Sequence, residues 1–195
     1  MLKPLLYAAV VMLIPNLVMG SSYFFEPSIG YRTERVKFTD KVNNQSQLKM
    51  QTPTYGLKLG YRSLLGVDLN LAGDYSSGNA EWSPLTEKVS FKHTMAAVQL
   101  GISALGAMKI YLGYAFLNTL QIDKGLLNSD LNLSGPAYQA GLQFRLFSSV
   151  TLGAQYNLNQ FNKVTGTNFT LVEKTESYFN KLDVEDYFLS LSISF

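Results

Sequence analysis

The sequence predicts an all-β fold, an eight-stranded antiparallel up-and-down transmembrane β-barrel with a polar-filled lumen. Apolar and polar residues alternate through eight segments of the 195-residue chain, and a period of two places them on opposite faces of a strand. Short and long connections between these segments also alternate. The last segment ends in an aromatic residue, Phe195, without a polar tail. One apolar face and one polar face in every strand are typical of a barrel wall that faces lipid.

The first four strands are expected over residues 23–38, 52–62, 65–75 and 90–103. Each has an aromatic or aliphatic face and an opposite face of glycine, charged or amide residues. In chain order the apolar faces carry Tyr23, Phe25, Ile29 and Tyr31; Tyr55, Leu57, Leu59 and Tyr61; Val67, Leu69 and Leu71; and Val98, Leu100 and Ile102. The opposite faces carry Glu26, Arg32 and Glu34; Lys58 and Arg62; Asp68 and Asp74; and His93 and Gln99.

The other four strands are expected over residues 107–122, 133–146, 149–161 and 187–195, and they repeat the pattern. Their apolar faces carry Ile110, Leu112, Tyr114 and Phe116; Tyr138, Leu142 and Phe144; Leu152, Tyr156 and Leu158; and Tyr187, Leu189, Leu191, Ile193 and Phe195. The opposite faces carry Lys109, Tyr111 and Gln121; Gln139, Gln143 and Arg145; Gln155 and Asn157; and Phe188, Ser190, Ser192 and Ser194. One such stretch is weak evidence, whereas the same alternation in every strand is strong.

The connections predict the direction of the strands. Those at residues 62–65, 103–107 and 147–149 are tight, while residues 39–51, 76–89, 123–132 and 162–185 form longer polar loops. Tight turns on one side of a membrane and long loops on the other are characteristic of outer-membrane barrels. With an even number of strands, both termini are expected on the tight-turn side, which is the periplasm.

Outward aromatic residues should then gather at the two membrane interfaces, where amphipathic rings meet water. The expected interface residues are Tyr31, Tyr55, Tyr75, Phe116, Tyr138, Tyr156 and Tyr187 at the long-loop end, with Tyr61, Phe144 and Phe195 at the tight-turn end.

The inward face predicts a network of opposite charges inside a narrow barrel. An eight-stranded barrel has room only for side chains, and buried charges must pair there. The expected network consists of Glu26, Arg32, Glu34, Lys58, Arg62, Asp68, Asp74, His93, Lys109 and Arg145. The near balance of signs favours a closed network that fixes the barrel shape. A narrow ion or proton path through gated pairs is the alternative.

The amino-terminal residues predict export. Lys3 precedes an apolar run over residues 5–18, and Val18-Met-Gly20 offers residues suited to a signal peptidase. We expect a signal peptide over residues 1–20, cleaved after Gly20, and a barrel domain over residues 21–195. The chain has no cysteine, which excludes disulfides and thiolate chemistry, and its formal charge of +2 gives no support to a nucleic-acid partner.

These features together resemble the small outer-membrane β-barrel proteins, the group of the OmpA transmembrane domain and OmpX. Residues Tyr187, Leu189, Leu191, Ile193 and Phe195 resemble the carboxy-terminal assembly signal of that class. The resemblance implies the bacterial outer membrane as location, with outer-membrane lipid, lipopolysaccharide and the barrel-assembly machinery as partners. It also implies a structural or surface-recognition, adhesin-like role, in which a partner of unknown identity binds the extracellular loops.

No catalytic residue, metal site or cofactor is expected. His93 is the only histidine, its parity points inward, and it lacks the His-x-Ser spacing of lipid A deacylase barrels. A lipid A-modifying enzyme, an ion-conducting pore and, less favoured, a soluble lipocalin-like barrel that binds a ligand remain alternatives. Trp82 is expected in a loop, as an interface anchor or a partner contact. Residues 169–172 are expected in a solvated hairpin tip, with an extension of the seventh strand beyond the membrane as the alternative.

Overall fold

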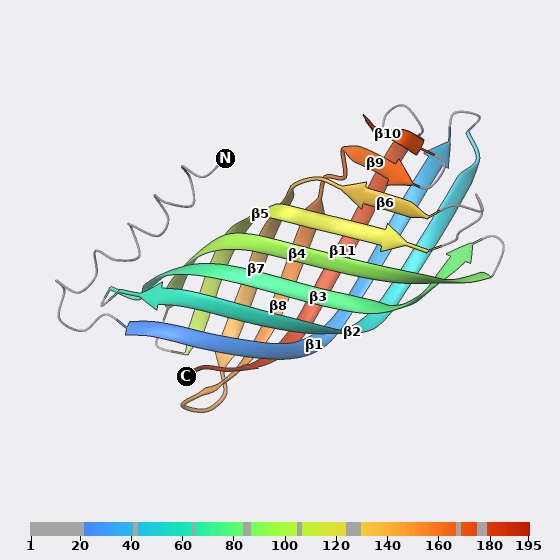
Figure 1. Ribbon diagram of the computed structural model, residues 1–195. Coiled ribbons are helices and arrows are strands. Elements are labelled where there is room, and N and C mark those ends of the chain that lie inside the picture. Colours follow the sequence, from blue (N-terminus) through green and yellow to red (C-terminus); the bar gives the residue numbers. More distant parts are fainter. Residues whose placement is uncertain are drawn as a thin grey trace.

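The computed structural model describes residues 22–40, 43–63, 65–83, 87–104, 107–123, 130–166, 169–174 and 179–195. In this part of the chain eleven strands form one antiparallel sheet (Figure 1). They are β1 (Ser22–Asp40), β2 (Gln45–Arg62), β3 (Val67–Ser83), β4 (Glu87–Ala104), β5 (Met108–Ile122), β6 (Leu131–Ser134), β7 (Ala137–Arg145), β8 (Val150–Asn159), β9 (Lys163–Gly166), β10 (Phe169–Lys174) and β11 (Phe179–Ile193). No helix among these residues is long and apolar enough to cross a membrane. The expected signal peptide lies outside the described residues.

Eight of these strands close into a barrel, which confirms the predicted fold class. Neighbouring strands pair in the order β1–β2–β3–β4–β5–β7–β8–β11, and β11 pairs with β1 to complete the ring. The last residue is part of the wall, because the Phe195 amide donates to the Phe25 carbonyl over 2.9 Å and the Phe25 amide donates back over 3.2 Å. One tight turn ends at Gly66, whose φ of 75° suits glycine.

The strands are longer than the alternation predicted, and the long loops are correspondingly shorter. β1 runs to Asp40 and β2 begins at Gln45, while β3 runs to Ser83 and β4 begins at Glu87. The expected loop of residues 162–185 contains β9, β10 and the first half of β11. β10 turns back to pair with β9, so the alternative that it extends the seventh strand is wrong.

A β-bulge changes which residues of β5 face the lumen. Ala96 pairs with Leu117 and Ala97 pairs with Ala115, so Phe116 is an extra residue in the wall. Beyond it the inward positions change from odd to even. Gln121 is therefore exposed on the outside, and its predicted inward position is wrong.

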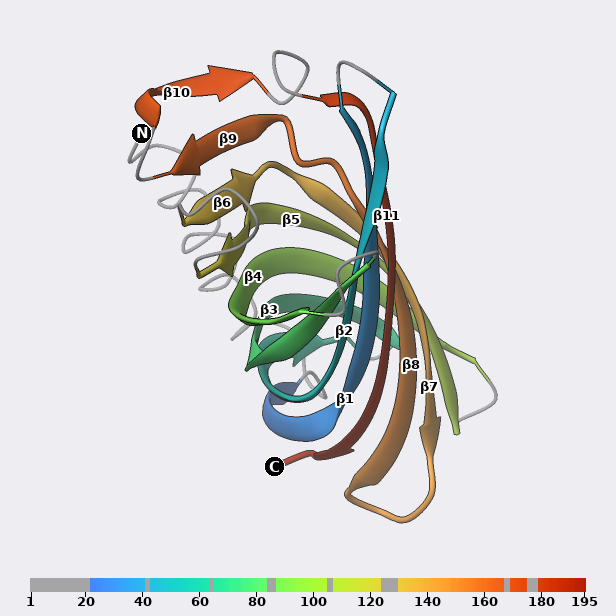
Figure 2. The ribbon, with the colours of Figure 1, turned by 90° about the vertical axis from the view of Figure 1, so that its right-hand side faces the viewer.

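At the long-loop end the wall divides. β5 pairs with β7 in its first half and with β6 in its second half, and β6 pairs in turn with β9. β8 pairs with β11 only as far as Asp186, while β1 continues along β11 to Phe179. Among the described strands, neither β9 nor β10 pairs with β11. Figure 2 shows β6, β9 and β10 on one side of the barrel and the ends of β2 and β11 on the other.

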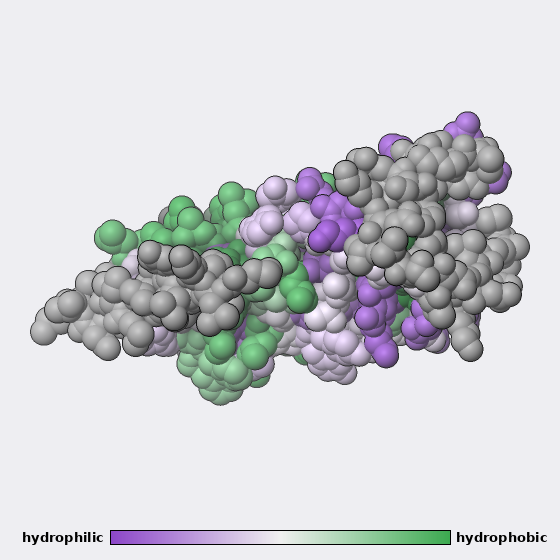
Figure 3. All heavy atoms as spheres, turned by 45° about the horizontal axis from the view of Figure 1, so that its top comes forward, coloured by the Kyte–Doolittle hydropathy of each residue, from purple (hydrophilic) through white to green (hydrophobic). Residues whose placement is uncertain are grey.

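The polarity of the wall reverses along its length. We call the tight-turn end of the barrel its lower part. In the lower part of β1 the outward residues are apolar, as at Ile29 and Tyr31, whereas Arg35 and Lys37 lie further along the same face. The inward face changes in the opposite sense. Figure 3 shows apolar surface gathered toward one end of the barrel and polar surface toward the other. This is the arrangement expected of a wall whose outer face meets lipid first and then water.

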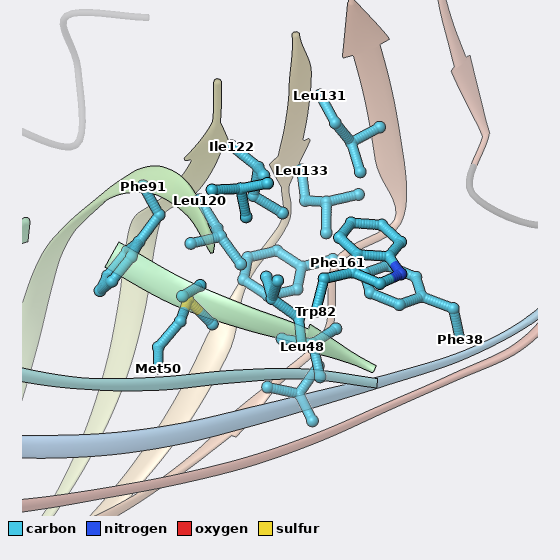
Figure 4. Packing of buried hydrophobic residues seen from close by; sticks show 14 of the residues in the cluster. Phe38, Leu48, Met50, Trp82, Phe91, Leu120, Ile122, Leu131, Leu133 and Phe161 are labelled. Atoms are coloured by element: carbon cyan, nitrogen blue, oxygen red, sulfur yellow. The ribbon is translucent and has the colours of Figure 1, made fainter. Parts of the chain in front are cut away.

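The reversal creates an apolar core inside the long-loop end (Figure 4). Its buried members include Val36, Phe38, Leu48, Met50, Trp82, Phe91, Leu120, Ile122, Leu133, Phe161 and Val164. The prediction of a polar-filled lumen therefore holds for the lower part of the barrel alone. We call this group of residues the apolar plug.

Candidate functional site

Arg32 lies at the centre of the polar network in the lumen. Its guanidinium is 3.2 Å from Asp74 Oδ2 on β3 and 3.4 Å from Asp186 Oδ1 on β11, and the side chain is 1% exposed. The ring of Phe188 covers one side, with the guanidinium carbon 5.3 Å from its centroid. Two carboxylates and an aromatic face thus hold the buried cation and link β1, β3 and β11 across the lumen.

His93 joins the same cluster from β4. Its Nδ1 atom lies 2.8 Å from Glu34 Oε2 and its Nε2 atom lies 2.7 Å from Asn118 Oδ1. The Asn118 amide donates to Asn159 Oδ1 over 3.1 Å, and Asn159 donates to Asp186 Oδ2 over 3.1 Å. A continuous chain of hydrogen bonds therefore passes from β1 through β4, β5 and β8 to β11.

A second ladder descends along β8. Asn157 donates to Asp186 over 2.9 Å, Gln155 donates to Asn157 over 2.7 Å, and the Tyr111 hydroxyl donates to Gln155 over 2.7 Å. Gly141 makes room for that phenol ring, because a Cβ atom there would overlap it.

The tight-turn end of the lumen has its own charge cluster around Asp68. Arg62 binds its two carboxylate oxygens over 2.9 and 3.1 Å, and Lys109 approaches within 2.7 Å. Both cations also lie over the Phe24 ring, each 5.2 Å from its centroid. Glu26, deeper in the barrel, accepts hydrogen bonds from the Gln143 amide and the Ser192 hydroxyl, each over 2.9 Å. These contacts occupy the lower lumen with paired polar groups.

The structure places most of the expected network residues inside the barrel. The buried ones are Glu26, Arg32, Glu34, Lys58, Asp68, Asp74, His93 and Lys109. Arg62 is half-buried. Arg145 is exposed; it lines the mouth of the barrel near Arg62 and Lys109 without entering the network. Asp186, which lies between the expected loop of residues 162–185 and the expected last strand, is fully buried and binds Arg32, Asn157 and Asn159.

The expected interface aromatics lie on the outer wall. Tyr61 is half-exposed, and the others are more exposed: Tyr31, Tyr55, Tyr75, Phe116, Tyr138, Phe144, Tyr156, Tyr187 and Phe195. Several pair across strands, as in Tyr156–Tyr187, whose ring centroids are 5.2 Å apart. In the assembly segment Leu189, Leu191 and Ile193 also face outward. Such a wall leaves large apolar side chains uncovered around the barrel, which suits a lipid environment.

Trp82 lies in the apolar plug and not in a loop. It is 8% exposed, and its ring stacks on Phe38 with centroids 5.7 Å apart and an interplanar angle of 4°. Phe179 packs against the other side of this pair, 5.1 Å from Phe38. Both the loop position and the interface or partner contact predicted for Trp82 are therefore wrong.

On the outer face around the apolar plug, the long-loop end of the barrel carries a row of charged residues. Cross-strand pairing aligns Glu185, Arg35, Lys49, Glu81 and Lys88 along one row over β11, β1, β2, β3 and β4. The Glu185 carboxylate forms ion pairs with two residues of β1, with Arg35 over 3.4 Å and with Lys37 over 2.9 Å. These hydrogen bonds and charges lower the pKa of the Glu185 carboxyl.

A polar hollow of about 450 Å³ opens beside this row at the end of the barrel. It is lined by residues of β1, β2, β3 and β11, including Lys37, Gln45, Gln47, Ser83 and Lys181. The hollow and this row of charged residues together form a polar surface at the end of the barrel, which we call the rim.

The cluster of two carboxylates and one histidine in the lumen is poorly suited to hold a metal ion. Among the described residues, Glu34, His93 and Asp186 bring one ligand atom each to within 4.8 Å of one another. The Arg32 guanidinium lies among them, 3.4 Å from His93 Nδ1 and 3.4 Å from Asp186 Oδ1. A bound cation would have to stand against that fixed positive charge.

Comparison with known proteins supports the fold. No protein-family model matches the sequence, and no curated protein matches it. Among solved structures, Ail, the attachment invasion locus protein of Yersinia pestis, superposes with a TM-score of 0.57 and 14% identity over 88% of this chain and 98% of that one. The outer membrane protein AlkL gives 0.55 and 19% identity over 88% and 90% of the two chains. Neisserial surface protein A gives 0.51 and 15% over 90% and 99%. The chain therefore has the fold of small outer-membrane β-barrels, as the resemblance predicted.

Two functional features escaped the sequence analysis. Asp186 lies just before the expected last strand, and the apolar plug combines residues of expected loops, such as Leu48 and Trp82, with the ends of expected strands, such as Leu120. A signal for both was present: the alternation continues through residues 35–38 and 182–185 with its polarity reversed, and Asp186 shares the inward parity of Phe188. The reversal shows where the outer face of the wall changes from apolar to charged.

Proposed function

We propose that this protein is a surface-recognition protein of the bacterial outer membrane, adhesin-like, with the rim as its working surface. The observation that supports this most directly is the reversal of wall polarity. A wall with an apolar plug inside and charged residues outside suits a part of the barrel that projects from the membrane into water. It presents a surface carried by paired strands, and a preorganised surface loses less entropy on binding.

The contents of the lumen support recognition over conduction. Paired charges fill the lower part, and large apolar side chains such as Trp82, Leu48 and Phe161 fill the upper part. An ion crossing the barrel would have to break buried ion pairs and then enter an apolar layer. Both steps are costly, so we expect no measurable single-channel conductance in planar bilayers.

An enzymatic role has little support from the geometry. His93 is fully buried, and its two ring nitrogens are occupied by Glu34 and Asn118. Catalysis on lipid A would need a reactive group that reaches the outer wall, where the described residues are aromatic and aliphatic. We therefore propose that the protein is not an enzyme, and an assay of lipid A for lost or added acyl chains tests this.

The charge of the rim points to an anionic partner. On β1–β4 and β11 the described side chains beyond the aromatic interface include six basic and three acidic residues: Arg35, Lys37, Lys49, Lys88, Lys92 and Lys181 against Glu81, Asp183 and Glu185. A net positive, rigid surface attracts anions through electrostatic complementarity. The structure of Ail in complex with the heparin analogue sucrose octasulfate shows a barrel of this fold beside a polyanion. We propose an acidic or sulfated glycan as the partner.

The test uses the protein in nanodiscs of neutral lipid, with heparin and sucrose octasulfate as probes. We expect binding that weakens with salt and falls at least about tenfold when Lys49→Glu and Lys88→Glu are combined. Lys163→Glu, an exposed lysine on β9 outside the row, is the matched control and should change affinity less than about twofold. Absence of binding at low salt, or equal loss in the control, would refute the proposal.

Residence in the outer membrane is part of the same proposal, with lipopolysaccharide around the wall and the assembly machinery acting on β11. Cold and boiled samples of outer-membrane fractions should migrate differently on SDS gels, because a closed barrel resists detergent until it is heated. Deleting Phe195 removes both backbone hydrogen bonds to Phe25 and should reduce the folded fraction. A water-soluble protein without a mobility shift would contradict the membrane assignment.

A further inference from the structure

The hydrogen bonds of His93 define which of its ring atoms carry protons. Glu34 Oε2 and Asn118 Oδ1 face Nδ1 and Nε2 at 2.8 and 2.7 Å. A carboxylate oxygen and an amide oxygen are both acceptors. A neutral imidazole has one donor nitrogen only, so both contacts are hydrogen bonds only when the ring carries two protons.

The orientation of Asn118 is fixed by the residues behind it. Asp186 Oδ2 accepts from the Asn159 amide over 3.1 Å and from the Asn157 amide over 2.9 Å. Asn159 therefore presents its oxygen to the Asn118 amide over 3.1 Å, which leaves the Asn118 oxygen facing His93. Exchanging the oxygen and nitrogen of Asn118 would place two acceptors, the Asn118 and Asn159 oxygens, against each other.

The charge balance of the buried groups in the lumen favours the same proton. Within the described part of the chain, five buried carboxylates stand in the lumen: Glu26, Glu34, Asp68, Asp74 and Asp186. Four lysine and arginine side chains face them: Arg32, Lys58, Arg62 and Lys109. An imidazolium at position 93 supplies the fifth positive charge and makes the set neutral, which a low-dielectric interior favours.

The charged groups around His93 agree with this count. Glu34 and Arg32 face it from β1, and Asp186 lies close to it from β11, while the neutral Asn118 comes from β5 and the ring of Phe161 lies 6.3 Å away. Arg32 Nη1 lies 3.4 Å from Nδ1, but Arg32 is itself bound to two carboxylates.

We propose that His93 is held as an imidazolium at neutral pH and that its two protons lock the lumen by tying β4 to β1 on one side and to β5 on the other. β1 and β4 are not neighbours in the sheet, so this link crosses the lumen. The proposal concerns the closed state of the barrel and is independent of any partner at the rim.

The chain offers a clean measurement, because His93 is its only histidine. An untagged protein labelled with ¹⁵N-histidine gives NMR signals from this ring alone. At pH 7.5 a free imidazole, with an ordinary pKa of about 6.5, is about nine-tenths neutral. We expect the spectrum of a doubly protonated ring instead. A spectrum with one unprotonated nitrogen at pH 7.5 would overturn the proposal.

Two variants locate the cause. Glu34→Gln removes the carboxylate that faces Nδ1 and should convert most of His93 to the neutral form at pH 7.5. Asp68→Asn removes one carboxylate from the distant cluster with Arg62 and Lys109, and it should leave the His93 spectrum protonated. An equal loss of the proton in both variants would show that the contact with Glu34 does not hold it. Should a variant fail to fold, the wild-type spectrum still decides the proton count.

Discussion

Replacing Leu48 by alanine tests whether the apolar plug is a true water-excluded core. Leu48 is fully buried on the inner face of β2, paired across the sheet with Val36 on β1 and Trp82 on β3. The substitution removes three carbon atoms, worth roughly 2.4 kcal/mol at about 0.8 kcal/mol for each buried methylene. The cavity left behind adds to this, and buried Leu→Ala changes typically cost about 2.7–5 kcal/mol. We expect a loss of about 3 kcal/mol in the free energy of unfolding.

The assay is equilibrium unfolding by urea of the protein folded in lipid vesicles. Trp82 is the only tryptophan and lies next to Leu48 in the plug, so its fluorescence reports on this region. Its emission should start blue-shifted and move to the red as the plug opens. Gln51→Ala, an exposed position on the outer face of the same strand, is the matched control and should change stability by less than about 0.5 kcal/mol.

A small effect would refute the reasoning. If Leu48→Ala costs less than about 1 kcal/mol, or if Trp82 emits in the red before urea is added, water already reaches the plug. The long-loop end would then be a loose group of strands, and the argument for a rigid rim would fail with it.

Three further predictions concern the lumen and the rim. Arg32→Met leaves its carboxylate partners buried without a cation and should destabilise the barrel by about 3–5 kcal/mol, measured by the same unfolding assay. Gly141→Val forces a side chain against the Tyr111 ring and should cost about 1–3 kcal/mol, whereas Gly141→Val in a Tyr111→Ala background should cost less. The pKa of Glu185 is lowered by Lys37, so its ion pairs contribute above the unfolded value of about 4.3 and are lost as pH falls through the lower folded value. NMR titration of the carboxyl should show that lowered midpoint, and Lys37→Gln should raise it.

Strand alternation predicted the fold because it is a local property that the solvent imposes directly. Residues such as Leu57 and Leu59 face lipid, while Lys58 between them must face inward. The eightfold closure followed from the number of such segments. The partners within the lumen could not be predicted, because they join strands that are distant in sequence, as Arg32 joins Asp74 and Asp186.

The bulge in β5 was invisible to this kind of analysis. Phe116 and Leu117 are both apolar and both exposed on the outer wall, so nothing in the local pattern marks the extra residue. The consequence appears further along, where Leu120 and Ile122 face inward and Gln121 faces outward. That stretch alternates correctly for a water-facing wall, but only once the change of parity is recognised.

The extent of the strands depends on a second solvent. The first strand was expected over residues 23–38, but the prediction did not include a change of polarity beyond Tyr31. In the structure the alternation continues with Arg35 and Lys37 outward and Val36 and Phe38 inward. One strand therefore carries two opposite patterns in series, because its lower half is solvated by lipid and its upper half by water. Under the proposed function, the point of reversal corresponds to the outer membrane surface, and the residues beyond it are the ones that a partner would meet. The rim and the plug are thus two consequences of one boundary: where the outer face of the wall becomes charged, the inner face becomes apolar and packs into a core.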